Sequence, residues 1–135
     1  MNRRVARLRA AQALYQIDVI KTEPDLAMES VLDDEEQPND FFHQLVYGTL
    51  EHKEELDGWI SSNLQGYTID RIGHVDRAIA RMALFEMKYV EDIPVNVTFN
   101  EAIELAKAFG GEEAGRFMNG VLSNSVDMMN EESNN

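Results

Sequence analysis

The chain has 135 residues, of which 44% are hydrophobic, and this content is sufficient for the core of one folded domain. Its 25 acidic residues against 12 lysines and arginines give a net charge of −13, but the hydrophobic fraction excludes an acidic disordered protein. The absence of cysteine excludes disulfides, cysteine-ligated zinc and thiol catalysis.

The N-terminal segment has no feature of a secretion signal. It is basic, but no apolar stretch follows the arginines, as a signal peptide would require. No other segment approaches the roughly 20 apolar residues of a membrane-spanning helix. We therefore expect a cytoplasmic protein.

Apolar residues recur at spacings of three and four along nearly the whole chain, which indicates helices rather than strands. Residues 22–25 interrupt this pattern, and Pro24 can begin a short second helix over 26–32. An acidic loop is expected at 33–38. In the first predicted helix, five residues recur at spacings of three and four and so lie along one face: Val5, Leu8, Gln12, Tyr15 and Val19.

Asn39 is placed to cap a third helix over 41–50, and a fourth follows over 56–64. A short helical turn is predicted at 68–70. The remaining predicted elements are a long, mostly buried helix over 75–90, a helix over 100–109 ended by Gly110 and Gly111, and a last helix over 117–126.

The predicted fold is therefore all-α, a compact bundle of about seven helices. It forms one domain over residues 1–129, followed by a disordered tail at 130–135 that has no apolar residue. Six aromatic residues are assigned to packing in the core: Phe41, Phe42, Trp59, Phe85, Phe109 and Phe117.

The charges are distributed unevenly along the chain. The first seventeen residues hold four arginines and no acid, whereas the remainder holds eight lysines and arginines against 25 acids. On a helix, Arg3, Arg4 and Arg7 fall within an arc of roughly 100°, and Arg9 lies on the far side. Such asymmetry indicates that the basic N-terminal end binds a polyanionic ligand, and that the acidic remainder suits a basic protein partner.

Gln12 and Tyr15 lie beside this arginine strip on the same predicted helix. A cationic strip next to an aromatic ring and an amide suits single-stranded RNA, because phosphates meet guanidinium groups while bases stack or form hydrogen bonds. The residues are equally compatible with a frayed basic terminus, with Arg7 paired to the acidic body and Tyr15 at the edge of the core.

A catalytic or metal site is not indicated by the side chains. His43, His52 and His74 lie in separate predicted elements. Asp40 and His43 share a helix face, but a carboxylate-bridged metal site needs inward glutamates on several helices. No strand precedes a glycine-rich phosphate loop. We therefore expect no enzyme activity, no metal and no cofactor.

Four motifs in order resemble the NusB family of bacterial transcription antitermination proteins. They are RRVARLRAAQALYQ from Arg3, VDRAIARMALFEM from Val75, IPVNVTFNEAIELAKAFG from Ile93 and RFMNGVLS from Arg116. The resemblance extends over almost the whole chain, although residues 23–65 match only in length and helical pattern.

This resemblance implies a fold of two small helical bundles without enzyme activity. It implies binding of the boxA element of nascent ribosomal RNA together with NusE, a basic ribosomal protein. The heterodimer joins a complex of Nus factors and RNA polymerase that keeps ribosomal RNA transcription processive. On this basis the acidic remainder of the chain attracts the basic partner.

The resemblance also assigns residues to roles. The RNA-binding residues it implies are Arg3, Arg4, Arg7, Gln12, Tyr15 and Asn119, and the partner-binding residues are Arg81 and Glu86. Two positions depart from the family pattern: Leu8 and Ser123 stand where an acidic residue is usual. The second departure leaves in doubt any polar contact that the family's aspartate makes.

Two other functions are compatible with a small helical protein of this kind. One is an RNA-targeting module of a ribosomal RNA methyltransferase, which the short chain beyond Val126 disfavours because no cofactor domain follows. The other is an adaptor in ribosome biogenesis that binds only proteins. Such an adaptor would bind its partner without any dependence on RNA.

Overall fold

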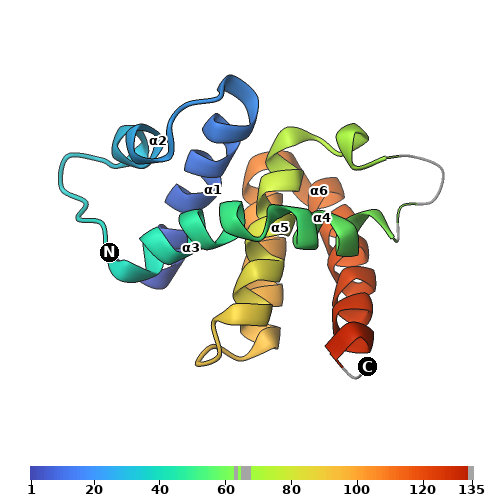
Figure 1. The fold of residues 1–135 in the computed structure, drawn as a ribbon. Helices are drawn as coiled ribbons and strands as arrows, with labels where there is room; N and C mark the ends of the chain where they lie inside the picture. Colours follow the sequence, from blue (N-terminus) through green and yellow to red (C-terminus); the bar gives the residue numbers. More distant parts are fainter. Residues whose placement is uncertain (63, 65–67, 134–135) are drawn as a thin grey trace.

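The computed structural model describes residues 1–62, 64 and 68–133, and its regular structure there is entirely helical (Figure 1). This confirms the all-α prediction. In the same residues, no helix is both long and apolar enough to cross a membrane. The elements are α1 (Arg3–Ile20), α2 (Pro24–Val31), α3 (Asp40–Glu51), α4 (Lys53–Ser61), the 3₁₀ turn η1 (Ile69–Arg71), α5 (His74–Tyr89) and α6 (Val95–Ser133).

Side-chain caps set the starts of two helices. The side chain of Asn2 accepts a hydrogen bond from the amide of Val5 at 2.8 Å, at the start of α1. Asn39 accepts one from the amide of Phe42 at 2.9 Å, which confirms the predicted cap of α3. Each cap satisfies an amide that has no partner within its helix.

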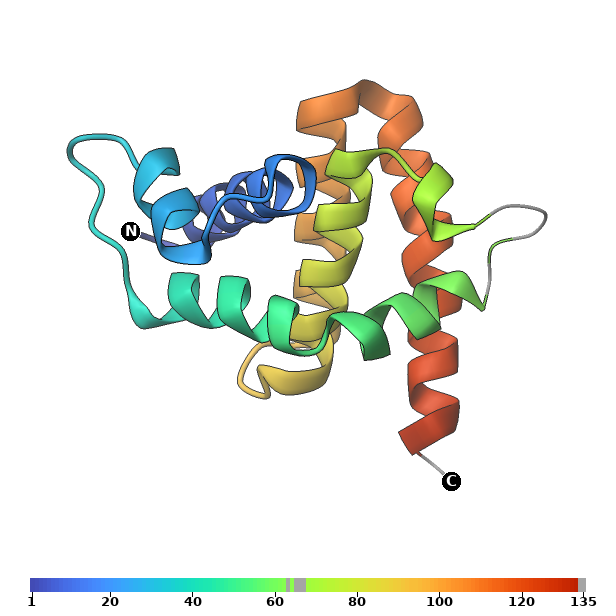
Figure 2. The same cartoon turned by 45° about the horizontal axis from the view of Figure 1, so that its top comes forward.

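The helices form two small bundles that are joined by helix α5. Helices α1, α2 and α3 pack together, and α4 and α6 pack on α5 (Figures 1 and 2). Helix α5 also packs against α1 and α3, so it joins the bundles. It is buried without interruption from Arg77 to Met87, which confirms the predicted long, mostly buried helix.

Helix α6 consists of two helical halves that meet at Gly111, where φ is 79° and ψ is −171°. Only glycine adopts this backbone region readily, which explains the predicted break at this point. The first half begins at Val95, five residues before the predicted start. Pro94 sets this start, because its carbonyl accepts hydrogen bonds from the amides of Val97 and Thr98.

The second half of α6 continues to Ser133, although the sequence predicts a disordered tail from Asn130. Two contacts explain the difference. Met129 is buried, and the indole nitrogen of Trp59 donates a hydrogen bond to a carboxylate oxygen of Glu132 at 2.5 Å. The contact to α4 is tertiary, so a local pattern of apolar residues does not reveal it.

Candidate nucleic-acid interface

Arg3 and Arg4 lie on the surface at the first turn of α1. Arg3 donates to Asp92 at 2.9 Å, and Arg4 donates to both oxygens of Glu101 at 2.9 and 3.2 Å. Their side chains remain 53% and 78% exposed. Both guanidinium groups are therefore accessible to a phosphate, but each already forms an ion pair with a carboxylate.

Arg7 lies on the inner side of α1 and is buried. It donates from Nε and Nη2 to the two oxygens of Glu86, both at 2.8 Å, and its guanidinium carbon is 5.5 Å from the centre of the Phe41 ring. Thr98 donates from its hydroxyl to the same carboxylate. One residue implied in RNA binding and one implied in partner binding are thus paired with each other inside the protein.

Arg9 points away from this strip, toward the predicted acidic loop. It donates to Glu36 and to Asp33, both at 2.8 Å, and to the amide oxygen of Gln12 at 3.0 Å. A backbone hydrogen bond from Asp33, together with the bond from Arg9, lowers the pKa of Glu36. The ion pairs of Arg9 therefore connect the acidic loop to α1. Gln12 is half-buried beside this loop.

Tyr15 lies farther along α1 and is 39% exposed. Its ring meets that of His74 edge to face, with 6.4 Å between the ring centres. Phe109, at the end of the first half of α6, is 44% exposed and lines the same hollow as Tyr15 and Gln12. The assignment of Phe109 to the core was wrong, because its side chain lies at the surface, whereas Phe42, Trp59 and Phe85 are buried as predicted.

Asn119 is exposed on the second half of α6, where its side-chain oxygen accepts a long hydrogen bond of 3.5 Å from Ser123. The two positions are one helical turn apart. The serine found in place of the family's usual acid therefore contacts a residue implied in RNA binding.

Arg81 is only 8% exposed and is held by two carboxylates. It donates to both oxygens of Asp57 at 2.6 and 3.0 Å and lies 3.8 Å from Asp18. Arg77, one turn earlier, donates twice to Asp18 at 2.6 and 3.1 Å. Burial acts to raise the pKa of Asp18, but the hydrogen bond from Arg77 and the attraction of both arginines lower it overall.

These two carboxylates were not identified from the sequence, although a signal was present. Arg77 and Arg81 are four residues apart on a helix predicted to be mostly buried, and buried cations need acidic partners. Asp18 and Asp57 lie on other helices, so only the fold identifies them. Among the described residues, three arginines and one glutamate are buried, and their ion pairs connect α5 with α1 and α4.

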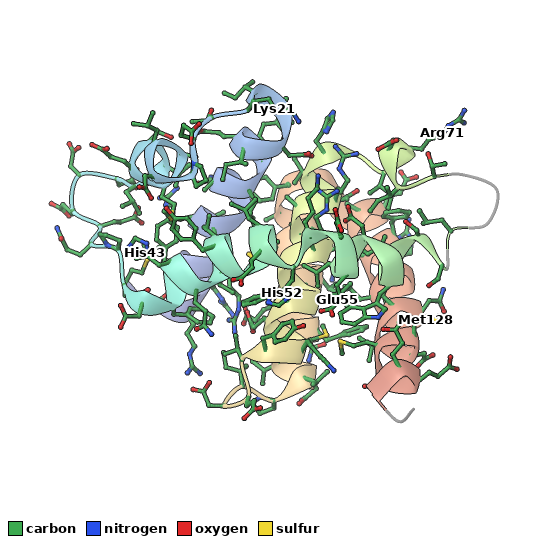
Figure 3. All side chains as sticks on the ribbon, in the orientation of Figure 1. Lys21, His43, His52, Glu55, Arg71 and Met128 are labelled. Atoms are coloured by element: carbon green, nitrogen blue, oxygen red, sulfur yellow. The ribbon has the colours of Figure 1, made fainter. Side chains whose placement is uncertain are left out.

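The histidines do not assemble into a metal site in the described residues, which contain no group of three or more possible ligands. His52 stacks on Tyr89 with 4.1 Å between the ring centres, and His74 lies beside Arg77. His43 is exposed at the start of α3 (Figure 3).

The model of the NusB family matches residues 4–127 of the chain. The transcription antitermination protein NusB of Shouchella clausii is 70% identical over 128 residues, which cover 95% of this chain and 96% of that protein. Among solved structures, NusB of T. maritima superposes with a TM-score of 0.85 at 32% identity, covering 94% of this chain and 92% of that one.

A second solved structure is similar and contains partners. The crystal structure of antitermination factors NusB and NusE in complex with double-stranded RNA matches with a TM-score of 0.83 at 29% identity, over 93% of this chain and 96% of that one. Sequence and fold agree over almost the entire length. The chain belongs to the NusB family.

Proposed function

We propose that this protein is a transcription antitermination factor that binds boxA RNA of nascent ribosomal transcripts together with NusE. The observation that supports this most is the 70% identity to a NusB transcription antitermination protein over 95% of the chain. The similar structure that contains NusB, NusE and RNA supports the same partners. The protein acts by binding within the RNA polymerase antitermination complex in the cytoplasm, without catalysis and without a cofactor.

Within this function, the members of the implied RNA set that are not buried contact the RNA directly: Arg3, Arg4, Gln12, Tyr15 and Asn119. The burial of Arg7 favours an indirect role. By pairing with Glu86 it holds α1 against α5, and so fixes the position from which Arg3 and Arg4 reach a phosphate.

Arg81 and Glu86 are also buried, so we assign them a supporting role in partner binding. They hold α5 against α4 and α1 beneath the surface that NusE meets. The net charge of −13 supports association with a basic ribosomal protein through long-range attraction.

The test is RNA binding by the purified chain, alone and with NusE, at two salt concentrations. Fluorescence anisotropy would compare a boxA RNA with a scrambled RNA of the same composition. We expect weak binding by the chain alone, tighter binding with NusE, and a preference for boxA. Partner binding that ignores RNA would instead favour a protein-only adaptor, and equal binding of both RNAs would refute sequence recognition.

A further inference from the structure

A cavity lies at the junction of the two bundles, between the end of α1, the end of α3 and the starts of α4 and α5. Its volume is about 250 Å³, and its apolar wall is formed by Leu14, Ile17, Leu50 and Ala78. An apolar cavity of about 150 Å³ is large enough to bind benzene. This cavity therefore has room for a small organic molecule with an apolar body.

One polar group in the wall has no partner. The side chain of Thr49 lines the cavity, the residue is only 2% exposed, and its hydroxyl forms no hydrogen bond within the described residues. A threonine in a helix can donate to the carbonyl four residues earlier, but this hydroxyl does not. A buried hydroxyl without a partner is unfavourable, so a ligand that accepts a hydrogen bond from it gains affinity.

The cavity wall is positively charged, although the whole chain carries −13. Three cations and one acid among the lining residues give a formal charge of +2: Lys21, Lys53, Arg81 and Asp18. Arg81 is neutralised by its ion pair with Asp57, and Asp18 is neutralised by Arg77. The two lysines therefore provide the excess charge, which favours an anionic ligand.

Lys21 is held at the edge of the cavity by an unusual backbone conformation. Its φ of 57° and ψ of 33° lie in the left-handed region, which lysine seldom adopts. Its ammonium donates to the backbone carbonyl of Asp18 at 2.8 Å, which directs the side chain back along α1. An ammonium group has three donors, so two remain for a ligand. Figure 3 shows Lys21 at the end of α1.

Lys53 is the second cation and lies at the start of α4, four residues after Thr49. In the part of the chain that the structure describes, it takes part in no ion pair or hydrogen bond. It also borders a neighbouring hollow that contains three glutamates: Glu51, Glu54 and Glu55. These acids repel a highly charged ligand such as a polyphosphate, so the cavity favours an anion with a single charge.

We propose that this cavity binds a small monocarboxylic acid with a branched aliphatic or aromatic body. The body packs against Leu14 and Ile17, and the carboxylate accepts hydrogen bonds from the Thr49 hydroxyl and from the ammonium groups of Lys21 and Lys53. This inference is independent of the proposed function, because neither RNA nor NusE enters it. Since the walls come from both bundles, an acid bound here stabilises their relative arrangement and links it to the acid's concentration.

The test uses the full chain, with 3-phenylpropanoate and 4-methylpentanoate as probes. At about ten times the Kd of either acid, the melting temperature should rise by roughly 3–6 °C. The neutral amide 3-phenylpropanamide should bind about tenfold more weakly, because it lacks the charge-assisted hydrogen bonds. In methyl NMR spectra, the resonances of Leu14 and Ile17 should shift, and that of Ile103 on α6 should not.

Two kinds of variant test the polar contacts. Thr49→Val keeps the volume but removes the hydroxyl, so affinity for the acid should fall on the order of tenfold while the fold is retained. Thr68→Val is the matched control, since Thr68 is exposed and caps no helix through its side chain. Lys21→Gln and Lys53→Gln should each weaken the acid and leave binding of the amide unchanged. Lys107→Gln, on α6, should affect neither ligand.

Three results would refute the proposal. The first is that neither acid shifts the Leu14 or Ile17 methyl resonances up to its solubility limit. The second is that acid and amide bind equally and Thr49→Val has no effect, because the cavity would then select only apolar bulk. The third is that the free chain binds no acid while a NusE segment cross-links to Lys53, because the occupant would then be a protein. None of these results bears on the proposed function, which is tested by RNA binding.

Discussion

The buried pair of Arg7 and Glu86 provides the sharpest test of which arginines contact RNA. Their side chains are 7% and 1% exposed and are joined by two hydrogen bonds of 2.8 Å. Arg7→Ala would leave the carboxylate of Glu86 buried with only the hydroxyl of Thr98 as a partner. Breaking a buried pair in this way costs about 3–5 kcal/mol. This is a large part of the roughly 5–15 kcal/mol that stabilises a domain.

Replacing both partners should restore most of this loss. The double variant Arg7→Met/Glu86→Leu fills a similar volume with apolar side chains and leaves no unpaired charge, so its stability should return toward that of the wild type. Urea unfolding followed by circular dichroism measures the free energy of unfolding of each variant. A double-mutant cycle then gives the coupling between the two residues.

RNA binding by the double variant decides the role of Arg7. If Arg7 acts only by holding α1, a stable double variant should bind boxA RNA with NusE as the wild type does. Loss of RNA affinity in a double variant that has regained its stability and still binds NusE like the wild type would refute this reasoning and indicate that Arg7 contacts the RNA itself. A stability loss below about 1 kcal/mol in Arg7→Ala, typical of surface pairs, would refute the burial argument.

Three further variants test the fold. Asn39→Ala should lose about 1 kcal/mol of unfolding free energy through its cap, whereas Gln44→Ala on the exposed face of α3 should not. The lowered pKa of Asp18 implies stability that is present above its ordinary value of 3.8 and lost as pH falls through the folded value. Asp18→Asn should therefore flatten the acid limb of a urea-unfolding series. In Gly48→Ala, the new Cβ would lie 2.0 Å from the buried Phe85 ring, which should cost about 1–3 kcal/mol in thermal unfolding. An unchanged melting temperature would contradict that packing.

Much of the helical layout follows from local signals in the sequence. The cap at Asn39, the break before Pro94 and the glycine bend after Gly110 each depend on a residue and its immediate neighbours. These signals locate helices well. They fail at residues 130–133, where the helix is held by a contact between α4 and α6 rather than by its own composition.

The candidate site is less predictable because burial depends on tertiary packing. The helical arc groups Arg7 with Arg3 and Arg4, but only the position of α5 shows that Arg7 is at the inner edge of the arc. Phe109 is a similar case: the helical spacing of apolar residues predicts that it packs in the core, but in the fold its side chain is 44% exposed.

The bend at Gly111 has a consequence for how the surface can vary. A Cβ there would meet no atom within 4 Å, so the obstacle to another residue is the backbone conformation alone. One pair of dihedral angles thus sets how the two halves of α6 are placed relative to each other. Side chains on either half can change without altering this angle, as long as the glycine remains.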